Sequence, residues 1–514
     1  MLAFWWKVHS FRSLSAVVLL SVVGVAGQSA NVSAGQTKTL LGADDAPQAI
    51  LTACASYARS MLPEERAFLM VRIATIASTG KLPQSTKWAR EAFLAGSDLQ
   101  ESWNKIALQK NALVALASTR SAEALRLLGT LPAPKATSEA RIDEDPRADA
   151  ARVIFESAYR KNGEKALSQM IQVSSYLGRT GEYPYVAWGI VLPKLAKKHP
   201  GTFGEVITTA VHFYGDAEGR TIIQDDDYLQ MVDALHTTAD SYQMKMAVTV
   251  GIDHLETAKT PKNEKYMDVV GQGLQRTAFD NRSKALLYRW LPLVKEFDSA
   301  DYEDLTKKLK VMASPQSTQH ASLEIVGNTQ NITPAVQQKA QDRLQAEIVE
   351  NDASNDADTA IRESTAIGSF ALRSDALAKG AMNVPAKAMP ERTKLLAESR
   401  RDLNQVNTKD AAYLQAIADL AYAYDQSKMR QTALSLVHDG LEQGSEILDE
   451  SADAQQNTPI MLLGGYDSLA KLTGIGMNLD PNFTLARVQS LRDFPLKVNL
   501  LVDIAESLGV NKIQ

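Results

Sequence analysis

The sequence contains one cysteine, Cys54, among 514 residues. A lone cysteine cannot form a disulfide within the chain, so packing alone must stabilise the fold. Aromatic residues make up only 6% of the chain, and long runs of β-branched residues are missing. Apolar residues almost never alternate with period two, which excludes a protein built mainly of half-buried strands. We therefore expect no sheet of three or more strands.

The chain also lacks an excess of one charge. It has 60 acidic and 55 basic residues, and its formal net charge is -5. A mildly acidic, well-mixed chain lacks the basic surface that attracts nucleic acid or anionic lipid, so we expect neither as a partner. The sequence has no P-loop and no glycine-rich dinucleotide-binding turn, and we predict no cofactor.

The first residues have the three regions of a secretory signal peptide. Residues 1–12 contain Lys7 and Arg12 and no acid, and an apolar run (LSAVVLLSVVGV) leads to Ala26 and Gly27. This run is too short to span a membrane as a stable helix. We predict cleavage after Ala26 or Gly27, with an uncleaved membrane anchor as the alternative. The mature protein is then a periplasmic or secreted bacterial protein without a stable membrane anchor.

The stretch Leu51-Thr52-Ala53-Cys54 has the form of a lipobox, at which exported bacterial proteins are cleaved and lipidated. A lipidated cysteine has to close the apolar region itself, whereas a polar stretch (QSANVSAGQTKTLLGADDAPQ) separates Cys54 from that region. The spacing instead predicts a helix that begins near Pro47. Cys54 is then a buried, inert thiol. The residues expected on the buried face are Ile50, Leu51, Cys54, Ala58 and Met61.

Beyond this point, apolar residues recur three and four positions apart through nearly the whole chain, which predicts an all-α fold. Helix-start signals support this, because Asp98-Leu99-Gln100-Glu101 has the pattern of a capping box and proline follows a capping residue elsewhere. We expect glycine to end helices at Asn162-Gly163 and Leu508-Gly509. The starts marked by proline are Asp145-Pro146, Thr333-Pro334, Thr458-Pro459 and Asp480-Pro481.

Some helices are apolar over much of their girth, notably residues 65–77 (ERAFLMVRIATIA). Such a helix contacts neighbours on more than one side, as inner helices of stacked hairpins do; the alternative is the central helix of a globular bundle. The pattern of residues 66–74 recurs at 497–505. About 485 mature residues exceed a single compact core, so several modules or an elongated array are expected. We predict stacked helical hairpins that form an α-solenoid, because helices and short turns continue through most of the chain.

One predicted hairpin has a more specific sequence pattern than the other helices. Residues 410–445 contain Ile417-x2-Leu420-Ala421-x2-Tyr424-x8-Ala433-x3-Val437 and resemble the tetratricopeptide repeat (TPR), a helical hairpin of about 34 residues. In that family a small residue lets the two helices approach, and an alanine lies where the second helix crosses closest. The chain departs from the family at four places: Ile417 replaces Trp, Ala421 replaces Gly, Val437 replaces Phe and Ser445 replaces Pro. The resemblance implies a TPR- or HEAT-like fold and no particular function.

Polar stretches divide the chain. Leu131–Pro146 is the clearest linker, and Ala313–Gln319 and Asn351–Asp358 are further breaks. The predicted organisation is a signal peptide at 1–27, a disordered linker at 28–45, helical modules at 46–130, 147–312 and 316–514, and a linker at 131–146.

An acidic stretch at 352–363 places oxygen donors as a calcium loop does, at Asp352, Ser354, Asp356, Asp358 and Glu363. The sixth place, which needs glycine for the turn, is Ala357. We interpret the stretch as an acidic helix cap, because a helix N-terminus favours carboxylates.

Two histidine pairs, His236/Asp240 and His320/Glu324, have the i, i+4 spacing of metal ligands on one helix face. A metal site needs three or four ligands, and no HExxH motif or Cys/His cluster supplies the others. We interpret both pairs as exposed polar pairs and Asp225-Asp226-Asp227 as a helix start. No metal site is predicted.

Two catalytic motifs are also rejected. Ser468-x-x-Lys471 matches the Ser-Lys element of penicillin-binding enzymes, but that fold needs a sheet with a Lys-Thr-Gly strand. Glu101-Ser102-Trp103 matches the Glu-Ser pair of lytic transglycosylases, but their Gly-x-Met-Gln stretch is missing downstream. We predict no catalytic residue.

Two hypotheses remain for the function. The first is an exported helical-repeat scaffold of the cell envelope that binds protein or peptide, because helical arrays present extended surfaces. The alternative is an all-α enzyme that acts on cell-wall glycan or polysaccharide with two facing carboxylates about 5–10 Å apart.

Overall fold

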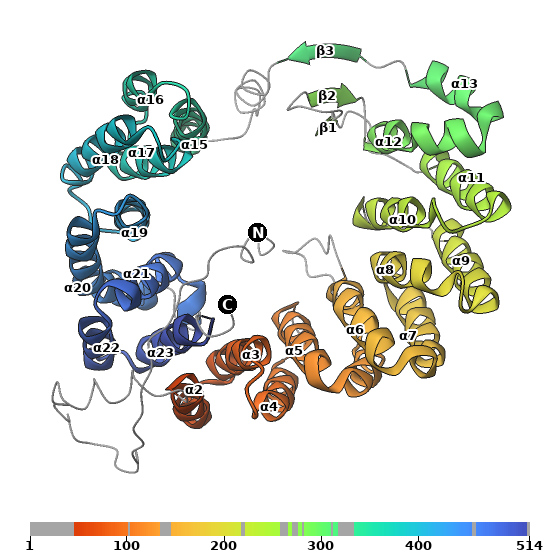
Figure 1. The fold of residues 1–514 in the computed structure, drawn as a ribbon, viewed down its shortest axis with the longest axis horizontal. Coiled ribbons are helices and arrows are strands. Elements are labelled where there is room, and N and C mark those ends of the chain that lie inside the picture. Colours follow the sequence, from red (N-terminus) through yellow and green to blue (C-terminus); the bar gives the residue numbers. More distant parts are fainter. Residues whose placement is uncertain are drawn as a thin grey trace. The chain divides into compact units, whose positions relative to one another are not determined.

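The computed structural model describes residues 46–100, 103–133, 145–216, 222–257, 266–269, 276–279, 282–309, 312–316, 334–454 and 459–510. The chain divides into two compact units, whose helices and strands are labelled in Figure 1. Unit 1 comprises Met1–Ile76 and Gln319–Gln514, and unit 2 comprises Ala77–Thr318. The modules predicted at 46–130, 147–312 and 316–514 were placed from the composition of the sequence, whereas the two units are defined by contacts in the structure. The modules therefore stay predictions.

In unit 1, alternate helices pack side by side. α15 packs against α17, α17 against α19, α19 against α21, and α21 against α23; we call these five helices the odd row. The helices between them pack on their neighbours along the chain, and α2 packs against α23. The bounds are α2 (Ala46–Tyr57), η1 (Ala58–Ser60), α3 (Pro63–Thr79), α15 (Pro334–Asp352), α16 (Ala357–Ser364), α17 (Phe370–Asn383), α18 (Met389–Leu403), α19 (Ala411–Gln426), α20 (Arg430–Ala454), η3 (Ile460–Leu462), α21 (Tyr466–Leu479), α22 (Pro481–Ser490) and α23 (Phe494–Val510).

Unit 2 is also mainly helical. α6 packs against α8 and α8 against α10, while α9 packs against α11. Large aromatic side chains fill its core, among them Tyr214 and Tyr228, whose rings stack with centroids 3.8 Å apart. The bounds are α4 (Ser85–Ser97), α5 (Trp103–Leu128), α6 (Pro146–Asn162), η2 (Gly163–Ala166), α7 (Leu167–Thr180), α8 (Tyr185–Leu195), α9 (Pro200–Gly215), α10 (Ile222–Leu235), α11 (Ser241–Thr257), α12 (Arg282–Phe297) and α13 (Ser299–Lys308).

Unit 2 contains a small sheet, so the expectation of no sheet of three or more strands is wrong. β1 (Tyr266–Val269), β2 (Arg276–Phe279) and β3 (Met312–Gln316) pair antiparallel in the order β1-β2-β3. These strands are too short for a period-two pattern to be recognised in the sequence. β3 also occupies part of the predicted break at 313–319. Its proline, Pro315, fits an edge strand, where a missing N–H is tolerated.

Several predicted helix ends are confirmed. The Asp145 side chain caps α6 by accepting a hydrogen bond from the Arg147 N–H (2.9 Å). Asp480 caps α22 in the same way. Gly163 follows α6 with φ at 54°, a conformation that favours glycine.

At two other places the structure differs from the predicted helix end. α23 continues through Gly509 to Val510, because its packing against α2 outweighs the weak helix propensity of glycine. Pro459 precedes a short 3-10 turn, not an α-helix. Glu101, Thr333 and Thr458 lie outside the described residues.

Cys54 lies in α2 as predicted, with its side chain fully buried. Its Sγ–H points at the Val498 carbonyl oxygen of α23 (3.8 Å), and burial raises the pKa of the thiol to about 12. Lipidation at Cys54 would require removal of most of α2 before that residue. The buried, unreactive thiol agrees with a packing role.

The two segments that share a pattern, 66–74 and 497–505, both lie in unit 1, in α3 and α23. Their matching apolar positions are all buried. The Arg72 guanidinium pairs with the Asp503 carboxylate, which lies 431 residues away and occupies the position of Arg72 in the second segment. The pattern therefore reflects two buried helices of the same unit.

Residues 410–445 form the predicted helical hairpin, α19 and the first part of α20. Asp410 caps α19, and the Tyr424 hydroxyl donates to the Leu396 carbonyl oxygen of α18 (3.2 Å). Ala421 and Ala433 are fully buried.

Ala421→Leu should therefore overpack the hairpin and lower the free energy of unfolding by about 1–3 kcal/mol. Gln426→Leu, at the half-buried end of α19, should change it little. Thermal or urea unfolding of both variants measures the difference. An Ala421→Leu protein as stable as the parent would contradict the tetratricopeptide-like register.

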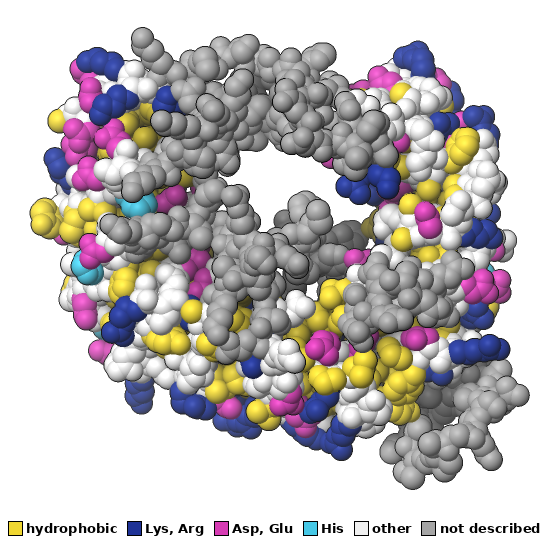
Figure 2. Space-filling view, turned by 180° about the vertical axis from the view of Figure 1, so that it is seen from behind, with side chains coloured by type: hydrophobic (Ala, Val, Ile, Leu, Met, Phe, Trp, Pro, Cys, Tyr) yellow, Lys and Arg dark blue, Asp and Glu magenta, His cyan; other side chains and the backbone are white. Residues whose placement is uncertain are grey.

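Charges of both signs intermingle on the described surface that Figure 2 shows, without a large area of one sign. Among the described helices, none is long and apolar enough to cross a membrane.

Candidate functional site

A cluster of charged side chains joins three helices of the odd row. Asp375 and Lys379 come from α17, Asp419 from α19 and Lys471 from α21. The Lys379 ammonium lies 2.7 Å from Asp375 Oδ2 and 3.7 Å from Asp419 Oδ2, and Lys471 Nζ pairs with Asp419 Oδ1. Both aspartates are only 6% exposed, whereas the lysine side chains are 41% and 35% exposed. Buried carboxylates thus hold partly exposed ammonium groups.

Uncharged groups complete this cluster. Gln415 Nε2 donates to Asp419 Oδ2, and the Ser468 hydroxyl donates to Gln415 Oε1 (2.8 Å). The Lys471 ammonium also lies 4.7 Å from the centroid of the Tyr422 ring, a cation–π contact. Side chains of α19 and α21 thus help to orient Asp419 and Lys471.

The two aspartates have opposite pKa shifts. Burial raises the pKa of Asp375 well above its usual value, and a hydrogen bond with Asp419 adds to the rise. Burial acts on Asp419 too, but the hydrogen bond from Asp375 and the charges of Lys471 and Lys379 outweigh it and lower the pKa. Neighbouring carboxyl groups that share a proton behave in this way, with the proton on one partner.

A second charged cluster lies further along the row. The Arg72 guanidinium of α3 donates to the Tyr466 hydroxyl oxygen (2.8 Å), to Asn499 Oδ1 (3.2 Å) and to Asp503 Oδ1. The Tyr466 hydroxyl donates in turn to Asp503 Oδ2 (2.8 Å). This network fastens α3 to α21 and α23 within unit 1.

Two exposed carboxyl groups, Asp467 and Glu506, flank this second cluster. Partial desolvation of their carboxyl groups by the neighbouring side chains, together with the charge of Asp503, raises the pKa of both groups. Burial alone would lower the pKa of Arg72, but the attraction of Asp503 and its neighbours raises it. Arg72 is therefore always charged, and the carboxyl groups around it exceed what one arginine neutralises.

Together the two clusters form what we call the charged strip of unit 1. Within it, carboxyl groups outnumber cations. Its members are Arg72, Glu350, Asp375, Lys379, Asp419, Asp467, Lys471, Asp503 and Glu506.

Sequence reasoning named only one member of the strip, Lys471, and rejected it as a catalytic base. In the structure the Ser468 hydroxyl bonds to Gln415, and the Lys471 ammonium bonds to Asp419. Asp375 and Asp419 were missed, since their spacing of 44 residues carries no local pattern. The one available signal was an aspartate inside an otherwise apolar helix segment, such as AIADLAYAY at 416–424.

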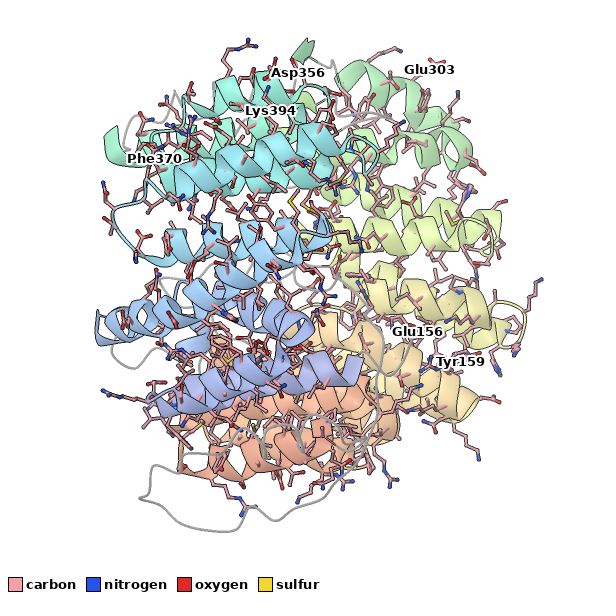
Figure 3. The ribbon with its side chains drawn as sticks, turned by 60° about the vertical axis from the view of Figure 1, so that its left-hand side comes forward. Glu156, Tyr159, Glu303, Asp356, Phe370 and Lys394 are labelled. Atoms are coloured by element: carbon pink, nitrogen blue, oxygen red, sulfur yellow. The ribbon has the colours of Figure 1, made fainter. Side chains whose placement is uncertain are left out.

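The acidic stretch at 352–363 forms a helix cap, as interpreted from the sequence. Asp356 precedes α16 and accepts hydrogen bonds from the Asp358 N–H (3.0 Å) and the Thr359 hydroxyl (2.6 Å), which lower its pKa. Lys394 of α18 pairs with Asp358. Figure 3 shows Asp356 and Lys394 close to each other. The carboxylates of Asp356 and Asp358 are thus bonded within the protein itself.

The histidine pair His236/Asp240 does not lie on one helix face. His236 follows α10 and contacts Glu296 Oε2 (2.9 Å), whereas Asp240 caps α11 by exchanging hydrogen bonds with Gln243. His320 and Glu324 lie outside the described residues. Among the residues that the structure describes, no group of three or more His, Cys, Asp or Glu is placed to hold a metal ion.

The aspartate triplet 225–227 lies inside α10, which begins at Ile222 and not at the triplet. Asp225 accepts a hydrogen bond from the Tyr214 hydroxyl (2.9 Å), and Asp226 pairs with Arg289. The triplet therefore links α10 to α9 and α12.

The chain matches no protein-family model, and no curated protein is similar to it in sequence.

Proposed function

We propose that the chain is an exported helical-repeat scaffold of the bacterial cell envelope that binds a protein or peptide segment along the charged strip of unit 1. Side-by-side packing of alternate helices supports a solenoid of stacked hairpins, TPR- or HEAT-like, in this unit. The segment at 1–27, read as a signal peptide, supports export.

The charged strip is the observation that carries this proposal. Buried ion pairs add little net stability, and well-packed apolar residues often replace them without loss. A row of helices that only had to pack would gain little from such groups. Their placement across successive helices, with ammonium and carboxyl groups reaching solvent, suits recognition of an extended segment.

The excess of carboxyl groups favours a partner segment that carries lysine or arginine. Charge complementarity of this kind sets specificity and speeds association, and salt weakens it. The alternative of a glycan-cleaving enzyme has less support. Asp375 and Asp419 are each only 6% exposed and pair with Lys379 and Lys471, so these two carboxyl groups are poorly placed to act on a glycan.

Photo-crosslinking in cells tests the proposal. A photoreactive phenylalanine analogue at Tyr422 of α19 should capture a defined partner, because this ring lies beside Lys471 in the strip. The same analogue at Ser435, an exposed position of α20 outside the odd row, is the matched control. Adducts at neither position, or equal adducts at both, would contradict binding along the strip.

A further inference from the structure

The cluster around Asp375 has an imbalance of charge. Asp375, Asp419 and Glu350 of α15 face only two ammonium groups, those of Lys379 and Lys471. With all five groups ionised, one negative charge remains in a largely buried place. A net buried charge is costly, so one proton bound to the cluster stabilises the packed helices.

The position of that proton follows from geometry. Asp419 contacts Lys471 and Gln415 and lies near Lys379, so its charge is well compensated. Asp375 contacts Lys379 through Oδ2 alone, and no donor reaches its buried Oδ1. Asp375 is therefore the group that keeps the proton, and its hydroxyl can donate to Asp419.

The other elements that pack on α17 carry further charges, and two of those on α18 are paired away from the cluster. On α18, Lys394 pairs with Asp358 of α16, and Asp402 pairs with Arg373. On α15, Glu350 has Glu347 as a second charged neighbour, which adds to the negative potential. The charge balance of the cluster thus depends on its five members and Glu347.

We propose that this cluster is a proton-operated contact between α17 and α19: it holds one proton while the helices are packed, and loss of that proton to solvent as pH rises loosens the contact. The O–H bond of Asp375 breaks, and two carboxylates then face each other. The contact joins helices of the charged strip, so partner binding should be proton-linked if the proposed function holds. The contact itself does not depend on a partner.

The contribution of Asp375 to stability should change with pH in one direction. The folded pKa of Asp375 lies above its unfolded value of about 3.9, so the stability from this group is full below that pH and declines as pH rises through the folded pKa. Asp375→Asn mimics the protonated acid at every pH. The stability of the parent relative to Asp375→Asn should therefore fall as pH rises above the unfolded pKa and through the raised folded pKa.

The matched variant is Asp419→Asn, because its carboxylate carries the charge that Lys471 and Lys379 need. Asp375→Asn should keep or raise the melting temperature at neutral pH, whereas Asp419→Asn should lower it clearly. A merely structural hydrogen bond would make both substitutions similarly harmful. Equal losses in the two variants would overturn the proposal.

Infrared spectroscopy of the parent protein provides a direct readout. The carbonyl stretch of a protonated carboxylic acid should be present at neutral pH and should be lost in Asp375→Asn. Glu350→Gln removes the surplus negative charge while keeping Asp375, so its carboxylic acid band should disappear at a lower pH than in the parent. This second variant tests the charge balance even if Asp375→Asn fails to fold. A parent without the band, or the same midpoint in Glu350→Gln, would contradict the proposal.

Discussion

Arg72→Met should destabilise unit 1 by about 3 kcal/mol, the largest loss that we expect from any single charged residue. The side chains of Arg72 and Asp503 are only 18% and 12% exposed, so removal of the guanidinium leaves the Asp503 carboxylate with little water to compensate it. Tyr466 and Asn499 lose their shared donor as well. Denaturant unfolding, followed by circular dichroism, measures the change.

A double variant should recover the stability that Arg72→Met loses. Arg72→Met with Asp503→Leu removes both charges, and a buried ion pair replaced by apolar residues of similar size is often neutral. The comparison variant is Arg90→Met, which breaks the exposed pair between Arg90 and Glu123 and should change the melting temperature little. If Arg72→Met behaved like Arg90→Met, the Arg72 cluster would not fasten α3 to α21 and α23.

Gly251→Ala should have the second largest effect, a loss of about 1–3 kcal/mol in unit 2. A Cβ atom on Gly251 of α11 would lie 2.4 Å from Cη2 and 2.6 Å from Cζ3 of Trp290. The indole of Trp290 is fully buried, so it cannot move aside without disturbing the core between α11 and α12. Thermal unfolding measures the loss.

Gly204→Ala is the matched control, because Gly204 also lies within a helix of unit 2, α9. The nearest atom to its added Cβ would be the flexible Gln243 Nε2 at 3.5 Å. Alanine should stabilise this helix by about 0.5–1 kcal/mol through its higher propensity. A Gly251→Ala protein as stable as Gly204→Ala would show that α11 and α12 approach less closely than described.

Local patterns in the sequence predicted the helices well. The spacing around Cys54 predicted α2 and the burial of Ile50, Leu51 and Cys54, although Met61, expected on the same face, lies beyond the helix and is half-buried. Asp145 and Asp480 cap helices as predicted. Such predictions succeed because capping and amphipathic spacing act within a few residues.

Features that depend on distant residues were not predictable in the same way. The strands β1 to β3 are stabilised by pairing with one another, between segments separated in the sequence, and they carry almost no period-two signal. The Asp375–Asp419 contact requires that α17 and α19 pack at one particular rotation, which no local spacing specifies. Ser468 and Lys471 were recognised as a motif, yet their partners come from α19.

The charge of the strip is the central claim, and charge reversal in solution tests it most directly. Asp467→Lys with Glu506→Lys changes two exposed carboxylates of the strip, on α21 and α23. Glu391→Lys with Glu442→Lys makes the same change of net charge on α18 and α20, outside the odd row. The partner captured at Tyr422 is titrated against both double variants.

We predict that the strip variant binds this partner at least about tenfold more weakly than the parent, a loss of about 1.4 kcal/mol, while the control variant binds as the parent does. Binding to the parent should also weaken as salt is raised. Equal affinity of the parent and the strip variant, or equal losses in both double variants, would contradict a partner that recognises the charged strip of unit 1.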